Sequence, residues 1–112
     1  MDTAVDKPAR LSSFPFQEVE ALLRTELMTV AKAEADMNGL ILPEKESEIA
    51  RAPIPMDSLV VVEILCSVES VLGFPPKEGA VRTGGYNSVQ DALDHMLPRL
   101  EKQWRKNQGR KA

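Results

Sequence analysis

The chain has 112 residues and a mass of 12.4 kDa, which is enough for one domain with a single core and too little for a two-domain enzyme. Its 43% hydrophobic and 28% charged residues exclude a disordered, collagen-like or disulfide-dense chain. The net charge is −3, but residues 38–97 carry nine acids and four bases whereas residues 98–112 carry one acid and six bases. An acidic body argues against nucleic acid as the main partner, because phosphate binding needs clustered Lys and Arg.

Cysteine content and hydropathy indicate the compartment. Cys66 is the single cysteine, so the chain has no internal disulfide, which is typical of a reducing environment. No apolar run approaches the ~20 residues that a membrane span needs, and the N-terminus lacks the apolar segment of a secretion signal. We therefore expect a cytoplasmic protein that is not embedded in a membrane. Because only 4% of residues are aromatic, an all-α fold packed through Leu, Val, Ile, Met and Ala is favoured.

The first predicted elements follow a flexible N-terminal arm at residues 1–12. An apolar stripe with helical spacing predicts a helix from Pro15 to Met37, capped by Ser13 and ended by Asn38-Gly39. Residues 39–56 contain three prolines and are predicted to be a long connection with a short helical turn near residues 47–51. We expect the apolar residues of this connection to hold it on the core: Leu40, Ile41, Leu42, Ile49 and Ile54.

The second long helix is predicted over residues 57–72 and is apolar around much of its circumference, so Cys66 is expected to pack as a small apolar residue. A turn-rich stretch with a short helix near residues 78–83 leads to the last helix, which opens at Asn87 or Ser88. Pro98 is expected to kink or restart this helix. The predicted domain therefore covers residues 13–97, and residues 98–112 form a basic helical extension or tail.

Few residues are suited to catalysis. His95, the single histidine, lies on an amphipathic helix and is expected at the surface or its boundary, and Cys66 has no evident basic partner. The acids do not have the spacing of a metal site, and Gly84-Gly85 is an isolated pair that we interpret as a turn. The sequence thus predicts a non-catalytic protein without a metal centre.

One motif has chemical significance. Asp57-Ser58-Leu59 follows a proline-containing loop and opens the apolar helix. A serine at a helix N-terminus presents its hydroxyl beside unpaired backbone N–H groups and the positive end of the helix dipole, a setting that favours an attached phosphodiester. Three further segments follow in order: Val62-Glu63-Ile64-Leu65, Gly73-Phe74-Pro75-Pro76 and Ser88-Val89-Gln90-Asp91-Ala92-Leu93.

Together these segments resemble the acyl carrier protein family over about residues 14–97. The resemblance implies a four-helix bundle of three main helices and one short helix, in which Ser58 opens the second helix and bears 4′-phosphopantetheine. Asp57 and Leu59 would flank the attachment site. In the family a separate phosphopantetheinyl transferase, with Mg²⁺, moves the arm from coenzyme A. The arm then carries an acyl chain as a thioester in fatty-acid, polyketide or specialised lipid biosynthesis.

The resemblance also implies partners: the transferase and acyl-transfer or ketosynthase-type enzymes, with the carrier itself a monomer. Partner enzymes of the family read acids along this helix, and Asp57, Glu63 and Glu69 fit that role. Val60 stands where the family usually has an acid, which implies a narrower, dedicated partner set. The expected partner surface comprises Met56, Asp57, Val60, Val61, Glu63 and Glu69.

Two alternatives remain from the sequence. A carrier of aminoacyl or peptidyl groups would also use a modified serine at this helix. A helical protein-interaction module would use Asp57-Ser58 only as a helix cap and Val60-Val61 as a docking patch.

Overall fold

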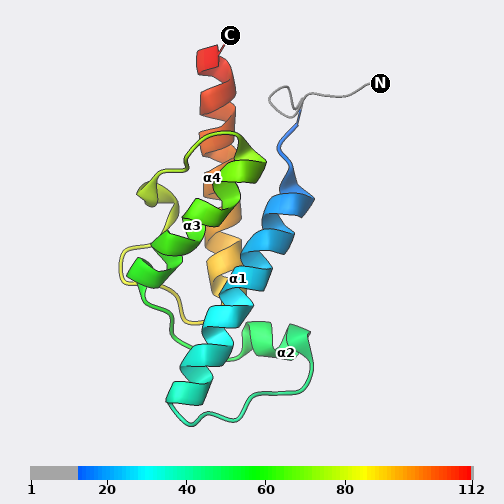
Figure 1. The fold of residues 1–112 in the computed structure, drawn as a ribbon, viewed down its shortest axis with the longest axis vertical. Coiled ribbons are helices and arrows are strands. Elements are labelled where there is room, and N and C mark those ends of the chain that lie inside the picture. Colours follow the sequence, from blue (N-terminus) through cyan, green and yellow to red (C-terminus); the bar gives the residue numbers. More distant parts are fainter. Residues whose placement is uncertain (1–12, 112) are drawn as a thin grey trace.

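The computed structural model describes residues 13–111, with side chains described as far as residue 108. The predicted arm at residues 1–12 lies outside the described residues, as do the side chains of Arg110 and Lys111. Within the described part the chain forms four α-helices and one 3-10 helix and no strand, which confirms the all-α prediction. The elements are α1 (Phe16–Met37), α2 (Glu46–Arg51), α3 (Ser58–Leu72), η3 (Glu78–Ala80) and α4 (Val89–Lys111) (Figure 1).

Helix α1 packs against both α3 and α4, and α4 also contacts α2 and η3. In Figure 1, α2 lies at the end of the molecule where α1 terminates, away from the C-terminus of the chain. The core is aliphatic, as the composition predicts, and its largest fully buried side chains are Leu23, Leu27, Ile54, Met56, Leu93, Met96, Leu100, Val19, Val61, Val68 and Val89.

The ends of α1 differ partly from expectation. The predicted cap at Ser13 is wrong: the helix begins at Phe16, Pro15 takes the capping position, and no side chain caps it. Pro15 instead contributes its carbonyl, which accepts the Val19 N–H at 3.0 Å. At the other end the prediction holds, because Gly39 is left-handed with φ +68° and Asn38 donates its side-chain amide to the Glu34 carbonyl at 2.7 Å.

The connection between α1 and α3 is held on the core by only part of its apolar residues. Ile49 and Ile54 are buried, and Leu42 packs against the core. Leu40 and Ile41 are 46% and 96% exposed, so the expectation that they pin the connection is wrong. The predicted short helical turn is α2. Its presence makes α3 the third α-helix of the chain, not the second as the resemblance implied.

Helix α4 runs through Pro98 without interruption to Lys111, so the expected restart does not occur. The N–H that Pro98 lacks would have bonded the carbonyl of Asp94, and both residues are exposed, where water can satisfy that carbonyl. Beyond Pro98, Leu100 and Trp104 are buried in the same core, and Trp104 meets Phe14 edge-on with ring centroids 6.0 Å apart. The basic segment therefore contributes to the hydrophobic core.

Candidate functional site

Ser58 is the first residue of α3, where the sequence motif placed it. Asp57 caps the helix, since its carboxylate accepts the Leu59 N–H at 2.7 Å and its carbonyl accepts the Val61 N–H at 3.2 Å. Ser58 is half-buried, and its hydroxyl makes no hydrogen bond with any other residue between 13 and 108. Because the neighbouring aspartate supplies the cap, the serine hydroxyl is not needed to hold the helix end.

A backbone clamp fixes the chain just before Ser58. The Met56 N–H donates to the Tyr86 carbonyl at 2.8 Å, and the Tyr86 N–H donates to the Met56 carbonyl at 3.0 Å. Gly85 makes this approach feasible: a Cβ built on it would lie 2.1 Å from the Met56 carbonyl oxygen and 3.1 Å from the Ser58 nitrogen. The start of α3 is thereby tied to the segment that leads into α4.

Polar side chains extend this clamp onto α4. The Tyr86 hydroxyl accepts the Arg82 backbone N–H at 2.8 Å and lies 2.8 Å from His95 Nδ1. Arg99 Nε donates to His95 Nε2 at 2.8 Å, so this ring nitrogen is unprotonated and the hydrogen of a neutral imidazole sits on Nδ1, facing Tyr86. His95 is half-buried, as expected for a boundary residue, and both of its nitrogens hold structure.

An ion pair between Arg82 and Asp91 joins the loop before α4 to the first turn of that helix. Arg82 donates to both carboxylate oxygens of Asp91, at 3.0 and 3.2 Å, and Asp91 also accepts the Asn87 N–H at 3.2 Å. The helix α4 cap is Ser88, whose hydroxyl accepts the Asp91 N–H at 3.0 Å, as one of the two predicted options had it. The loop before α4 is thus anchored at several points.

The contacts and burial around the clamp shift the pKa values of Asp91, Tyr86 and His95. The guanidinium of Arg82, by hydrogen bonding, lowers the pKa of Asp91. Burial raises the pKa of Tyr86. Burial lowers the pKa of His95, and the positive charges of Arg99 and Arg82 lower it further. At neutral pH the uncharged imidazole is therefore the favoured form of His95 in the folded chain.

Two residues of the expected partner surface lie in the core. Met56 is 2% exposed and Val61 is fully buried, so placing either on a docking surface is wrong. Met56 is turned inward by its pairing with Tyr86, and Val61 begins the buried stripe of α3 that continues with Ile64, Leu65, Val68 and Leu72. A docking patch of Val60 and Val61 together is excluded by the same burial.

The remaining residues of that surface are accessible. Asp57, Glu63 and Glu69 are exposed, and none of them forms an ion pair with another described residue. Val60 is half-exposed, and Leu59 is 75% exposed beside Ser58. The exposed face of α3 therefore combines an apolar side chain with unpaired acids.

Cys66 belongs to this exposed face, so the expectation that it packs as a small apolar residue is wrong. It follows the buried Leu65 by one position, and a single step along a helix turns the side chain by about 100°. The high hydrophobicity of α3 concealed this difference between neighbouring positions.

Sequence reasoning missed the residues that hold the site. Gly85 was interpreted only as part of a turn, and Tyr86 was not singled out. Both have a weak signal in the sequence: a glycine pair followed by the chain's only tyrosine, just before a helix cap. That signal does not say which other loop the pair approaches.

The described residues contain no helix with the length and hydropathy of a membrane span, and no group of three or more His, Cys, Asp or Glu side chains arranged to hold a metal ion. Comparisons with protein-family models, curated proteins and solved structures found no match to this chain. The site must therefore be interpreted from its own geometry.

Proposed function

We propose that this protein is a carrier that holds acyl groups as thioesters on a 4′-phosphopantetheine arm attached to Ser58. The observation that carries the proposal is the position of Ser58: a half-exposed serine, first in a helix, beside an aspartate cap, whose hydroxyl bonds no other residue between 13 and 108. A phosphodiester on that oxygen would lie next to the unpaired N–H groups and positive dipole end of α3. When bound, the arm supplies the thiol that carries the acyl group.

The surroundings of Ser58 support a modified serine more than a catalytic one. The only histidine, His95, has one ring nitrogen facing Tyr86 and the other accepting from Arg99, so neither is free to activate a serine. Attachment from coenzyme A needs no base in this chain, because the transferase supplies it. The Ser58 oxygen gains the phosphopantetheine phosphorus, and adenosine 3′,5′-bisphosphate and the hydroxyl proton are released.

The exposed face of α3 supports docking of partner enzymes. Asp57 and Glu63 flank Leu59 in sequence and are free of ion pairs with described residues, which suits a basic partner surface with an apolar contact near Ser58. Such charges mainly speed encounter and set specificity. Within the proposal, the expected partner surface loses the buried Met56 and Val61 and keeps Asp57, Val60, Glu63 and Glu69. The exposed Leu59 is added to it.

The fold is compatible with an acyl carrier. Its two short helices, α2 and η3, differ from the single short helix that the family resemblance implies. The three long helices occur in the expected order, whereas α2 precedes the serine helix and the stretch before α4 has a single 3-10 turn, Glu78–Ala80. We therefore propose a specialised acyl carrier, with a dedicated set of acyl-transfer or ketosynthase-type enzymes, and place it in the cytoplasm as a monomer.

Intact-mass measurement after incubation with coenzyme A, Mg²⁺ and a broad-specificity phosphopantetheinyl transferase tests the proposal. We expect one phosphopantetheine group to add to the protein and to Ser70→Ala, which removes an exposed serine from the same helix, and none to add to Ser58→Ala. Circular dichroism of each variant checks that the helices remain.

Absence of any addition with several transferases, on folded protein, would overturn the carrier and favour the interaction module that uses Leu59 as an exposed contact. Addition that persists in Ser58→Ala would overturn the assigned site. The identity of the cargo, acyl or aminoacyl, is read by supplying candidate loading enzymes to the modified protein and repeating the mass measurement.

A further inference from the structure

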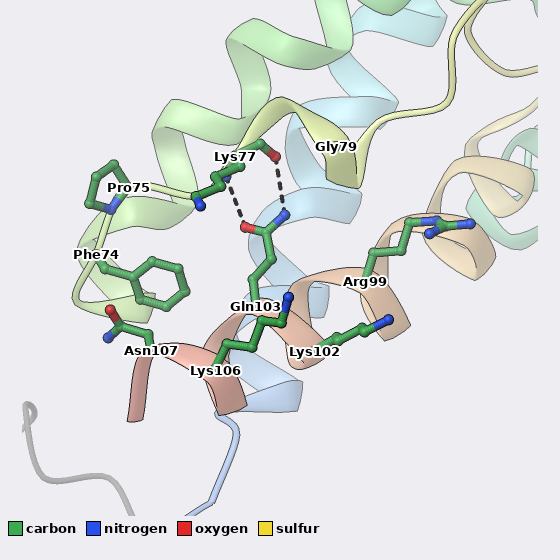
Figure 2. Close-up of a pocket in the computed structure, with 9 residues that line it drawn as sticks. All are labelled: Phe74, Pro75, Lys77, Gly79, Arg99, Lys102, Gln103, Lys106 and Asn107. Carbon is green, nitrogen blue, oxygen red and sulfur yellow. Dashed lines mark hydrogen bonds between the residues drawn. The ribbon is translucent and has the colours of Figure 1, made fainter. Parts of the chain in front are cut away.

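A pocket of about 370 Å³ lies at the opposite end of α3 from Ser58, between the loop that follows this helix and the second half of α4 (Figure 2). Fourteen helical steps separate Ser58 from Leu72, which is about 21 Å along the helix axis. The volume of the pocket falls within the range of small-molecule sites. The pocket is therefore separate from the proposed attachment site.

The charged side chains that line the pocket are all basic: Lys77, Arg99, Lys102 and Lys106. Figure 2 shows the last three following one another along one side of α4, in accordance with their spacing of three and four residues. None of the four forms an ion pair with a described carboxylate. Glu101, the one acid in this part of α4, pairs with Arg105 instead.

Polar contacts fix the two walls of the pocket relative to each other. The Gln103 side chain accepts the Lys77 N–H at 2.8 Å and donates to the Lys77 carbonyl at 3.2 Å, so the loop is joined to α4 (Figure 2). Arg99 is held at its Nε by His95, which leaves the two terminal nitrogens of the guanidinium for another acceptor. Phe74, which packs against the core, and Pro75 give the pocket an apolar side.

These features select a class of ligand. Four cations without an acidic partner attract a ligand with more than one negative charge, and guanidinium and ammonium groups bind phosphate oxygens well. The acidic body, with nine acids and four bases over residues 38–97, disfavours a long polyanion such as nucleic acid. The side chains of Phe74 and Pro75 suit an apolar or planar group beside the charges.

We propose that this pocket binds a small phosphate ester whose phosphates contact Lys77, Arg99, Lys102 and Lys106 and whose apolar or planar part lies against Phe74. The proposal does not depend on the carrier function of Ser58. A protein that is never modified at Ser58 would still show this binding, and a modified carrier without it would leave the first proposal intact.

The test is a titration of ¹⁵N-labelled protein with two soluble probes, inorganic pyrophosphate and adenosine 5′-diphosphate. Binding is measured by NMR from the chemical shifts of the backbone amides. We expect saturable shifts at Phe74, Lys77, Gly79 and Gln103, with tighter binding of the diphosphate that carries a ring. Binding should weaken with added salt, because the contacts are exposed and electrostatic. Failure of both probes to shift these amides at low salt would overturn the proposal.

Paired variants with equal charge distinguish a site from general attraction. Lys102→Gln with Lys106→Gln should weaken pyrophosphate binding about tenfold or more, since two charge-assisted contacts are lost. Lys45→Gln with Arg51→Gln removes the same charge from two exposed positions that lie outside the pocket and form no ion pair with a described residue, and it should leave the affinity within about twofold. Gln has a helix propensity close to that of Lys and Arg, so folding is preserved. Equal losses in the two double variants would overturn a defined site.

Two further arms test the remaining parts of the proposal. Phe74→Leu keeps an apolar side chain against the core and should weaken the binding of adenosine 5′-diphosphate but not that of pyrophosphate. An equal loss of affinity for both probes would overturn the role of the ring.

Co-sedimentation with vesicles of phosphatidic acid in phosphatidylcholine distinguishes a lipid headgroup from a free ligand. Vesicle binding without binding of either soluble probe would overturn the small-molecule ligand.

Discussion

At the scale of single residues, Gly85 decides how closely the loop before α4 approaches Ser58. Its φ of +89° lies in the left-handed region, and a Cβ there would overlap the Met56 carbonyl oxygen at 2.1 Å. The neighbouring Gly84 has a similar φ of +94° but open space around it. The two glycines therefore carry the same conformational cost for substitution and differ only in the contact.

We predict that Gly85→Ala destabilises the fold much more than Gly84→Ala. Gly84→Ala should lower the free energy of unfolding by about 1–2 kcal/mol through backbone strain alone. Gly85→Ala should add to this the cost of separating Met56 from Tyr86, and it should increase hydrogen exchange at the Met56 amide. Urea unfolding of both variants checks the difference, and equal losses would show that the contact with Met56 carries little energy.

At the scale of the element, helix α3 shows how strongly adjacent positions differ. Val60 is half-exposed and lies outside the core cluster, whereas Val61 is fully buried. Val60 is also in the first turn of the helix, where an acidic side chain interacts favourably with the helix dipole. A carboxylate at position 60 would therefore be partly solvated, whereas a carboxylate at position 61 would be buried in the core.

We predict that Val60→Asp changes the free energy of unfolding by no more than about 0.5 kcal/mol. Val61→Asp should cost more than about 3 kcal/mol, because it buries a carboxylate without a partner. Thermal unfolding followed by circular dichroism measures both. A large loss in Val60→Asp would mean that this residue packs in the core and that the proposed partner surface of α3 is too wide.

At the scale of the whole molecule, the single histidine links stability to pH. The pKa of His95 is lowered in the folded chain from its ordinary 6.5, so below pH 6.5 the unfolded chain binds more protons than the folded one. Stability should therefore fall as the pH drops from about 7 toward the folded pKa. A proton on Nε2 would also remove the acceptor for Arg99.

We predict that urea midpoints of the unmodified protein decrease from about pH 7 to pH 5 and that His95→Gln flattens this dependence. Because the chain has one histidine, the difference between the two curves belongs to this residue. The pKa of Asp91 is lowered by its hydrogen bonds with Arg82, which keeps the titration of this carboxyl below the window. Parallel curves for the two proteins would contradict the proposed coupling between His95 and the fold.

Prediction from the sequence succeeded where the signal was local. The ends of α3 are set by Asp57, which caps its start, and by Gly73, which adopts a left-handed φ of +86° at its end. The serine motif likewise located Ser58 at the start of a helix without knowledge of the fold. Prediction failed for Ser13, because Pro15 takes the capping position, and for Ile41, whose exposure depends on how the connection packs on the core.

The same contrast applies to the last helix. Its sequence contains a proline and a basic composition, so the local signal indicated a kink or restart at Pro98 and a domain limit at residue 97. Burial of Leu100 and Trp104 against the rest of the core makes continuation favourable, since each removes a large apolar side chain from water. Helical stability in proteins comes mostly from such packing, which composition along one segment does not reveal.

Local signals were enough to predict the helical class of the chain, the limits of α3 and the position of Ser58, because caps, glycine stops and apolar periodicity act within a few residues. Packing of the helices settles which side chains face solvent, how the loops close on Gly85 and Tyr86, and how Lys77 joins the three cations of α4 around one pocket. Those features join residues far apart in the chain, such as Lys77 and Gln103, and their meeting depends on how the helices pack.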